Sequence, residues 1–291
     1  MLAIVLPKGS LEKQVLELFS AGDLHVVRGG DRDYHARVDD PRIDKVRFLR
    51  PQEIPTYVEQ GIFDLGISGR DWVTETGADV VSLGEIGGGR AGEAVVSVVL
   101  AVPKESPWNS VSDLPDGVRI STEMPETTRR FLEEHGVKAK VFTSHGATEA
   151  KIPDIVDAIV DLTETGSSLR KAGLKIIATL LTSRTELLAN REAYEDPAKR
   201  AAMDDLVVLL RGALAAQDKV LLKLNVPVAS LDGVLEVLPA MSSPTVMSTA
   251  TDDVRALETV VPKQGVNRLI PSLKAAGARD ILELPISKIV E

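Results

Sequence analysis

The sequence predicts an α/β protein with two successive α/β lobes and a smaller C-terminal domain. Through residues 1–211, short apolar runs alternate with amphipathic segments, which is typical of mostly parallel sheets with helices on their faces. The alternation restarts near residue 118, which indicates a second lobe. Residues 212–291 instead follow the order β-α-β-β-α-β of the ferredoxin-like fold.

The first lobe begins with a continuous apolar run at residues 2–6, as expected for a buried parallel strand. Pro7 ends this run, and Ser10 suits the N-cap of a helix whose apolar residues recur at helical spacing. Further strands are expected at residues 46–49, 64–68 and 95–102, with helices opening at Arg50-Pro51 and after Gly69.

The second lobe is expected to contain strands at residues 118–121, 138–142, 156–162 and 175–181. Its helices are expected at residues 126–134, ended by Gly136, and from Ser167 to Gly173. A helix over residues 196–211, which is charged early and apolar late, closes this core.

The C-terminal domain is expected to have strands at residues 219–226, 246–251, 254–261 and 281–286. Its first helix has apolar residues at helical spacing from Leu231 to Leu238. Pro271 falls in the second helix, over residues 266–276, and lacks the N–H that a helix interior needs. We therefore expect this second helix to begin late or to bend.

The composition excludes several classes of function. A net charge of −9 repels polyanions, and aromatic residues are 3% of the chain, so nucleic acids and anionic membranes are poor partners. The absence of cysteine excludes disulfides, thiolate metal sites and a cysteine nucleophile. The apolar run near residues 94–102 is shorter than a spanning helix needs, and the N-terminal run is too short for a signal peptide. We expect a soluble, cytoplasmic protein.

The most informative stretch is residues 156–169, where an apolar strand ends in Asp161 and a loop rich in Thr, Gly and Ser opens a helix. Exposed N–H groups at a helix N-terminus, with hydroxyls beside them, make a cradle for phosphate. Asp161 is placed to accept hydrogen bonds from a ribose diol. A helix-capping loop without a ligand explains the same pattern equally well. The loop comprises Thr163, Glu164, Thr165, Gly166, Ser167 and Ser168.

Three cations follow expected strands: Lys8, Arg50 and Arg70. Ligands of open α/β sheets bind beyond the carboxyl ends of the strands, so these side chains could gather one polyanion. Each of them, taken singly, is more simply a solvated loop residue. The successive glycines at residues 87–89 suit a nucleotide site, a hinge or a plain turn. The four histidines show no metal-ligand spacing.

Five segments, spread from the first strand to the last domain, resemble those of a known family. They are Leu6-Pro-Lys-Gly-Ser-Leu11, Leu49-Arg-Pro-Gln-Glu-Ile-Pro55, Asp64-Leu-Gly-Ile-Ser-Gly-Arg-Asp71, Asp157-Ala-Ile-Val-Asp-Leu-Thr-Glu-Thr-Gly166 and Ser243-Pro-Thr245. Each segment is a weak signal. In this order they make the chain, from Leu2 to Ile289, similar to the long form of the ATP phosphoribosyltransferase family, whose reaction is the first step of histidine biosynthesis.

This resemblance implies a two-lobed catalytic core similar to type II periplasmic binding proteins. Lobe I would comprise residues 1–95 with 182–211, and lobe II residues 96–181. An ACT-like regulatory domain at residues 212–291 would bind histidine as feedback inhibitor. The implied reaction transfers the phosphoribosyl group of phosphoribosyl pyrophosphate to N1 of ATP and releases pyrophosphate. It also implies Mg²⁺, carried mainly by the substrate, and a homo-oligomer in which dimers form a hexamer.

The resemblance also assigns roles to individual residues. Asp161 would hold the ribose hydroxyls, the 163–168 loop would hold the 5′-phosphate, and Glu149 would be a further substrate-binding residue. Lys8, Arg50 and Arg70 would face the pyrophosphate or the triphosphate, and Asp71 the nucleotide. The histidine contacts would be Asn225, Met241, Ser243 and Thr245. Asn225 stands where some members carry an acid, and Glu123-Met124 stands where an aromatic residue is frequent.

The chemistry of such a transfer agrees with these residue types. Positive charge develops at the ribose carbon while negative charge grows on the leaving group, so positioning and prearranged charge matter more than a strong base. The alternative function is an intracellular anion- or solute-binding regulator, because lobes of this kind also serve as receptors. Release of pyrophosphate from the two substrates with Mg²⁺ distinguishes an enzyme from a regulator.

Overall fold

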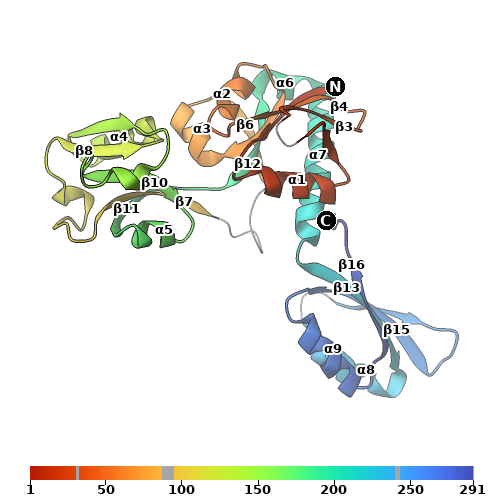
Figure 1. Ribbon diagram of the computed structural model, residues 1–291. Helices are drawn as coiled ribbons and strands as arrows, with labels where there is room; N and C mark the ends of the chain where they lie inside the picture. The colour runs from red at the N-terminus through yellow and green to blue at the C-terminus, as the bar shows by residue number, and fades with distance from the viewer. Residues whose placement is uncertain (31–32, 87–94, 240–242, 291) are drawn as a thin grey trace. The chain divides into compact units, whose positions relative to one another are not determined.

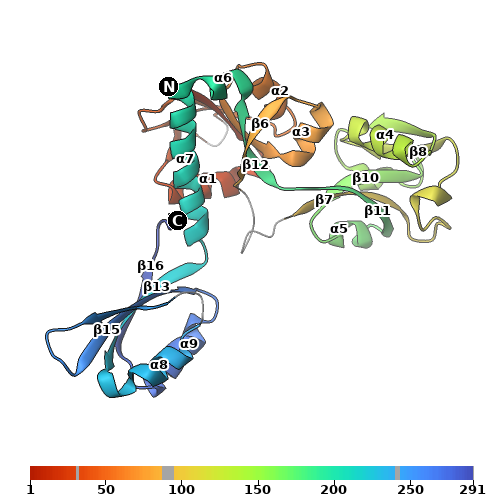
Figure 2. The same ribbon diagram turned by 180° about the vertical axis from the view of Figure 1, so that it is seen from behind.

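The computed structural model describes residues 1–30, 33–86, 95–239 and 243–290. Contacts divide the chain into two compact units, drawn in Figures 1 and 2. The first comprises Met1–Glu17 with Leu24–Asp205, and the second comprises Leu18–Asp23 with Leu206–Glu291. The first unit contains two separate sheets, which correspond to the two expected lobes.

The sheet of the first lobe has the strand order β2-β3-β4-β1-β5-β12-β6. Strand β1 is parallel to β4 and β5, whereas β12 and the β2–β3 pair run antiparallel to their neighbours. The expectation of a mostly parallel sheet is therefore wrong here, because β3 and β12 each run antiparallel to both of their neighbours. The bounds are β1 (Leu2–Pro7), β2 (Val26–Arg28), β3 (His35–Val38), β4 (Ile43–Leu49), β5 (Leu65–Gly69), β6 (Val80–Glu85) and β12 (Thr185–Asn190).

Helices of the first lobe pack on this sheet through a buried apolar cluster that includes Val5, Val58 and Leu188. Gly66 lets α2 approach β5, since a Cβ atom at Gly66 would lie 2.6 Å from Cγ2 of Val58. The helix bounds are α1 (Glu12–Ala21), α2 (Ile54–Glu59), α3 (Arg70–Thr76) and α6 (Arg191–Glu195).

The sheet of the second lobe has the order β11-β7-β10-β8-β9. Strand β8 is parallel to β9 and β10, and β7 is antiparallel to β10 and β11, so this sheet is also mixed. The strands are β7 (Val96–Pro103), β8 (Val118–Thr122), β9 (Ala139–Thr143), β10 (Ala158–Thr163) and β11 (Leu174–Ser183). The helices are α4 (Pro125–Glu134) and α5 (Ser167–Lys171), with short 3-10 turns η2 (Val111–Asp113) and η3 (Thr148–Lys151).

Helix α3 joins the two lobes within the first unit. Trp72 of α3 is buried in the apolar cluster of the second lobe, beside residues such as Leu100 and Val160. The carboxylate of Glu75 accepts hydrogen bonds from the backbone N–H groups of Glu126 (2.9 Å) and Thr127 (2.8 Å), in the first turn of α4. These N–H groups have no partner inside their own helix, so Glu75 caps α4 from the other lobe.

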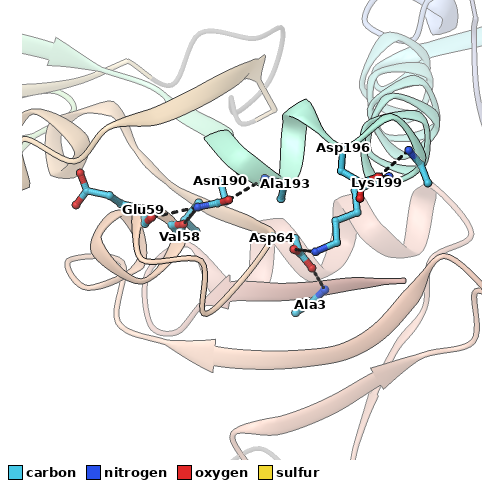
Figure 3. A network of polar contacts seen from close by, with 9 residues as sticks. Ala3, Val58, Glu59, Asp64, Asn190, Ala193, Asp196 and Lys199 are labelled. Carbon is cyan, nitrogen blue, oxygen red and sulfur yellow. Dashed lines mark hydrogen bonds and ion pairs between the residues drawn. The ribbon is translucent and has the colours of Figure 1, made fainter.

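Buried polar contacts join the end of the first sheet where β1 and β5 begin to the helices α2, α6 and α7 (Pro197–Ala216) (Figure 3). Asp64, which is 9% exposed, accepts hydrogen bonds from the backbone N–H of Ala3 and from Nζ of Lys199, each at 2.7 Å. The Asn190 side chain donates to the carbonyl of Val58 (2.9 Å) and accepts from the N–H of Ala193 (2.8 Å), which caps α6. A buried carboxylate and amide are thus satisfied, as burial requires.

The second unit has the β-α-β-β-α-β order that the sequence predicts. Its antiparallel sheet has the strand order β14-β15-β13-β16, and its apolar core includes Leu222, Val234 and Leu273. The elements are β13 (Lys219–Pro227), η4 (Val228–Ser230), α8 (Leu231–Val237), β14 (Thr245–Ser248), β15 (Val254–Pro262), α9 (Val266–Ala275) and β16 (Arg279–Pro285).

Two longer helices behave differently from their sequence predictions. Helix α7 (Pro197–Ala216) begins in the first unit and ends in the second, five residues beyond its expected end. Helix α9 does not begin late: it begins at Val266 and continues through Pro271. Asn267, whose carbonyl would have accepted from residue 271, is exposed, so water can replace the missing donor. No helix in the described residues is long and apolar enough to span a lipid bilayer.

Candidate active site

The carboxyl ends of β1 and β4 bring Lys8 and Arg50 together, as the sequence predicts. The strands are paired in parallel, and the N–H of Lys8 donates to the carbonyl of Leu49 at 2.7 Å. Gly9 follows with φ +94°, a conformation that favours glycine. A Cβ atom on Gly9 would lie 3.5 Å from Nη1 of Arg50, so the guanidinium group lies against this turn.

Two further charged residues that the sequence analysis did not single out join this group. Glu12, in the first turn of α1, lies 3.3 Å from Nζ of Lys8 and 2.6 Å from Nη2 of Arg28. Burial opposes the charge of Glu12, but hydrogen bonds from Arg28, Gly9 and Lys8 outweigh it and lower the pKa of this carboxyl. The spacing of four residues between Lys8 and Glu12 is visible in the sequence. Arg28 lies on a strand of three residues that the sequence pattern does not predict.

Arg70 and Asp71 begin α3 at the carboxyl end of β5, which is the neighbour of β1. Nη1 of Arg70 lies 3.5 Å from the carboxylate of Glu186 on β12. Asp71 is 4% exposed and accepts a hydrogen bond of 2.5 Å from the Ser183 hydroxyl. Burial raises the pKa of Asp71 although hydrogen bonds lower it. A Cβ atom at Gly69 would lie 2.0 Å from Oδ1 of Asp71, so a larger residue at position 69 would displace the Asp71 carboxylate.

In the second lobe, Asp161 lies in β10 rather than at its end, and its side chain is half-buried. Its Oδ1 accepts from the N–H of Leu162 at 2.7 Å. Burial raises the pKa of Asp161, the Leu162 bond lowers it, and the nearby charges of Glu149 and Glu123 raise it further. The structure therefore gathers Asp161, Glu149 and Glu123 into one acidic region, and the presence of Glu123 in it is not visible in the sequence pattern.

The loop after Asp161 has the turn that the sequence predicts. Gly166 has φ +69°, and its N–H donates to the hydroxyl of Thr163 at 2.8 Å. Arg170 holds the loop from the helix side by donating to the carbonyl of Thr165 at 2.9 Å. The polar residues Glu164, Thr165, Ser167 and Ser168 are exposed.

Lys151, in η3, is a cation of this lobe that sequence reasoning missed. Its Nζ donates to the hydroxyls of Ser144 (2.5 Å) and Ser121 (3.3 Å), which are 3% and 2% exposed. Ser121 belongs to β8, the parallel neighbour of β10. Lys151 therefore fixes η3, which carries Glu149, to the carboxyl ends of β8 and β9.

Two of the four residues expected to contact histidine, Asn225 and Thr245, lie on different strands of the second unit. Asn225 is in β13, where its side-chain amide donates to the carboxylate of Asp280 at 2.9 Å. Thr245 begins β14 and Ser243 precedes it; both are exposed. Met241 and the glycines at residues 87–89 lie outside the described residues. Within the described part of the chain, no group of three or more His, Asp or Glu side chains is arranged to hold a metal ion.

The two mixed sheets, linked where β11 ends at Ser183 and β12 begins at Thr185, define a two-lobed α/β core, which a ferredoxin-like domain follows. One lobe offers cations at its strand ends and the other a carboxylate with a hydroxyl-rich loop. The chain belongs to the ATP phosphoribosyltransferase family, in its long form. The family pattern described as ATP phosphoribosyltransferase matches residues 50–212, and that described as HisG, C-terminal domain, matches residues 216–288.

Full-length relatives agree with this assignment. A protein of Desulforudis audaxviator named ATP phosphoribosyltransferase is 48% identical over 291 residues, and one of Pelotomaculum thermopropionicum with the same name is 46% identical over 290 residues. Each alignment covers 99% of both chains. A solved ATP phosphoribosyl transferase (HisG:HisZ) complex from Thermotoga maritima is 26% identical, with a TM-score of 0.62 over 72% of this chain and 98% of that chain. The predicted family and fold class are confirmed.

Proposed function

We propose that this chain transfers the 5-phosphoribosyl group of phosphoribosyl pyrophosphate to N1 of ATP and releases pyrophosphate, which is the first step of L-histidine biosynthesis. Family membership over the full chain carries this proposal. The family acts on ATP and phosphoribosyl pyrophosphate and requires a divalent metal. The location of Asp161 beside a hydroxyl-rich turn supports the same activity, because a ribose 5-phosphate presents a diol and a phosphate together.

Asp161 accepts hydrogen bonds from the ribose hydroxyls, and the loop of Thr163, Glu164, Thr165, Gly166, Ser167 and Ser168 binds the 5′-phosphate. Glu149 contacts the same substrate from η3. This division is supported by the acidic region around Asp161 and by the exposure of the loop's polar residues. An ionised carboxylate accepts hydrogen bonds at both oxygens, so we expect this lobe to bind the diol best above the raised pKa of Asp161.

Lys8, Arg50 and Arg70 bind the phosphates of the pyrophosphate or the triphosphate, and Asp71 contacts the nucleotide. The pairing of β1 with β4 and β5 supports this assignment, because it gathers the three strand ends. Cations fixed before the reaction stabilise the charge that grows on departing pyrophosphate without rearranging in the transition state. N1 of adenine carries no proton to remove, so the transfer needs no general base. Closure around the substrates would exclude water, which otherwise hydrolyses the activated ribose.

The divalent metal is Mg²⁺, held mainly by the substrate's phosphates, which is the usual way that this ion enters phosphate-binding sites. The carboxylates around Asp161 are oxygen donors of the type that Mg²⁺ and its bound waters prefer. When bound, the ion neutralises part of the charge on the leaving pyrophosphate.

The chain divides its work among three parts. Lobe I comprises residues 1–95 with 182–211, lobe II residues 96–181, and the regulatory domain residues 212–291. The regulatory domain binds histidine, which inhibits the enzyme by feedback. The residues that contact histidine are Asn225, Met241, Ser243 and Thr245. Dimers of the chain assemble into a hexamer. The match of residues 216–288 to the C-terminal domain of the family supports this division.

The test is an acceptor panel. The purified chain is mixed with phosphoribosyl pyrophosphate, Mg²⁺ and one of ATP, GTP, adenine or no acceptor, and pyrophosphate release is followed continuously. We expect rapid release with ATP and slow release with the others. Equal pyrophosphate release with another acceptor would mean that the enzyme transfers the phosphoribosyl group to a different base. No pyrophosphate release with any acceptor would favour the binding regulator.

A further inference from the structure

The charged group at the turn after β1 is larger than the predicted site, and its organisation depends on Glu12. The side chains of Lys8, Glu12 and Arg28 are 20%, 15% and 14% exposed, so all of them are largely withdrawn from water. Charges in such positions are arranged by specific partners, because solvent no longer screens them.

Glu12 connects two parts of the lobe. One oxygen lies 2.6 Å from Arg28 on β2, and the other lies 3.3 Å from Lys8 at the end of β1. The N–H of Gly9 also points to this carboxylate, at 3.4 Å. Donors from β1, the following turn and β2 thus converge on a single side chain of α1.

The ring of Phe48, which is fully buried in β4, supports both cations. Cζ of Arg28 lies 4.9 Å from the ring centre, and Nζ of Lys8 lies 5.8 Å from it. Cation–π contacts at these distances are attractive. The two cations would nevertheless repel each other in this low-dielectric position, and the carboxylate between them offsets that repulsion.

Lys8, Arg28 and Arg50 bring three cations to this turn. Lys8 and Arg28 share the carboxylate of Glu12, and the guanidinium of Arg50 lies close to Gly9. Cations that converge on one glycine-containing turn, in a chain with a net charge of −9, suit the phosphates of a polyphosphate.

We propose that Glu12 is a positioning residue, which holds Lys8 and Arg28 as a fixed pair of cations for the phosphates of one substrate, and that Arg28 is an anion-binding residue of this site. The inference rests on the proposed function, since it extends the role given there to Lys8. Both substrates carry polyphosphate groups, so the kinetic constants for each must be measured separately.

The effect of neutralising Glu12 on turnover, anion binding and stability distinguishes a positioning role from simpler roles. A carboxylate that only masks positive charge would, when neutralised, tighten anion binding and leave turnover unchanged. A purely structural carboxylate would lower stability and leave the turnover of the folded enzyme unchanged. A positioning carboxylate, when neutralised, releases the two cations and lowers kcat, because displacement of a binding group by about 1 Å can cost about 100-fold in rate.

The experiment compares Glu12→Gln with Glu17→Gln in the full-length protein. Glu17 lies on the same helix and pairs with Lys13 at the same i,i+4 spacing (3.8 Å), but its side chain is 67% exposed. We expect kcat of Glu12→Gln to fall about 10- to 100-fold while Glu17→Gln keeps wild-type kinetics. The midpoint of thermal unfolding and the inhibition by pyrophosphate are measured for both variants. Unchanged kcat in folded Glu12→Gln, with or without tighter pyrophosphate binding, would overturn the positioning role.

Arg28→Lys provides an independent test, because it keeps the positive charge beside Glu12 but removes the planar guanidinium group, which can donate two parallel hydrogen bonds to a phosphate. We expect KM to rise severalfold for the substrate whose phosphate Arg28 binds, with the KM of the other substrate unchanged. The affected substrate then identifies whether ATP or phosphoribosyl pyrophosphate occupies this turn. Wild-type constants for both substrates would overturn the role of Arg28. Loss of activity in the wild type and in Glu17→Gln would instead contradict the proposed function.

Discussion

At the scale of single residues, Asp161 lies in surroundings that disfavour its ionised form. Its carboxylate is half-buried beside Glu149 and Glu123, and these surroundings raise its pKa. We predict that Asp161→Asn lowers kcat about 100-fold, the usual loss when one prearranged polar contact to a reacting group is removed. The amide oxygen can still accept from Leu162, so the fold should persist. Steady-state kinetics measure the loss, and a near-wild-type kcat/KM would reject the assigned role.

The same substitution has a predicted effect on stability. A carboxyl whose pKa is higher in the folded protein than in the unfolded chain favours folding below its unfolded pKa, and this contribution is lost as pH rises through the raised value. Asp161→Asn removes that loss. We therefore expect the variant to have a higher free energy of unfolding than wild type at about pH 8. The difference should be smaller at about pH 5. Denaturant unfolding at both values measures the difference; a variant less stable at the higher pH would contradict this reading.

Lys8 is the second residue whose replacement is informative. Lys8→Ala removes a charge from the turn after β1, whereas Lys13→Ala removes an exposed charge from α1. We expect Lys8→Ala to lose about 100-fold in kcat/KM and Lys13→Ala to lose little. The comparison controls for the change in net charge. Equal kinetics in the two variants would mean that Lys8 does not bind substrate.

Sequence reasoning found the residues that follow strong strand patterns and missed those brought in by weak ones. Lys8 and Arg50 were predictable because parallel strand ends meet at one edge of a sheet. Arg28 was not, because its strand, Val26–Arg28, has three residues and is too short to show a repeating pattern. Lys151 was not, because its role depends on buried hydroxyls that come from β8 and from the chain after β9.

At the scale of secondary structure, the existence of most elements was predictable but their directions were not. Apolar runs indicated β1, β7 and β10 correctly. Strand β12 was missed, because one residue separates it from β11 and no glycine or proline marks a turn there. Together with β3, this strand makes the first sheet mixed. Pro271 was a misleading signal, since an exposed helix face tolerates the lost donor.

The cap that Glu75 provides to α4 is a testable element-scale feature. Its carboxylate satisfies two N–H groups of a helix from the other lobe. We predict that Glu75→Ala lowers the free energy of unfolding of the first unit by about 1–2 kcal/mol, the range found for helix N-caps. Glu133→Ala, at an exposed position late in the same helix, is the control. Equal unfolding midpoints for the two variants would show that the cap contributes nothing.

At the scale of the whole molecule, the division into units affects how regulation should be tested. Residues 18–23 of the chain pack with the C-terminal unit, and buried Leu18 and Phe19 belong to it. Deleting residues 212–291 would remove most of this unit and leave residues 18–23 and 206–211 behind, so point variants are the cleaner test. We predict that Asn225→Ala, in the full chain, weakens histidine inhibition by about 1–3 kcal/mol of coupling while kcat without histidine stays unchanged. Unaltered inhibition would remove Asn225 from the histidine site.

The defining step of the proposed reaction is the bond that forms between the ribose carbon and N1 of ATP. Phosphoribosyl pyrophosphate labelled with ¹³C at C1 is incubated with ATP, Mg²⁺ and the enzyme, and the fate of the label is followed by NMR. We predict that the label becomes bonded to N1 of adenine, with one pyrophosphate released for each bond formed. Label found only in free ribose 5-phosphate, or in unreacted donor, would contradict the proposed function.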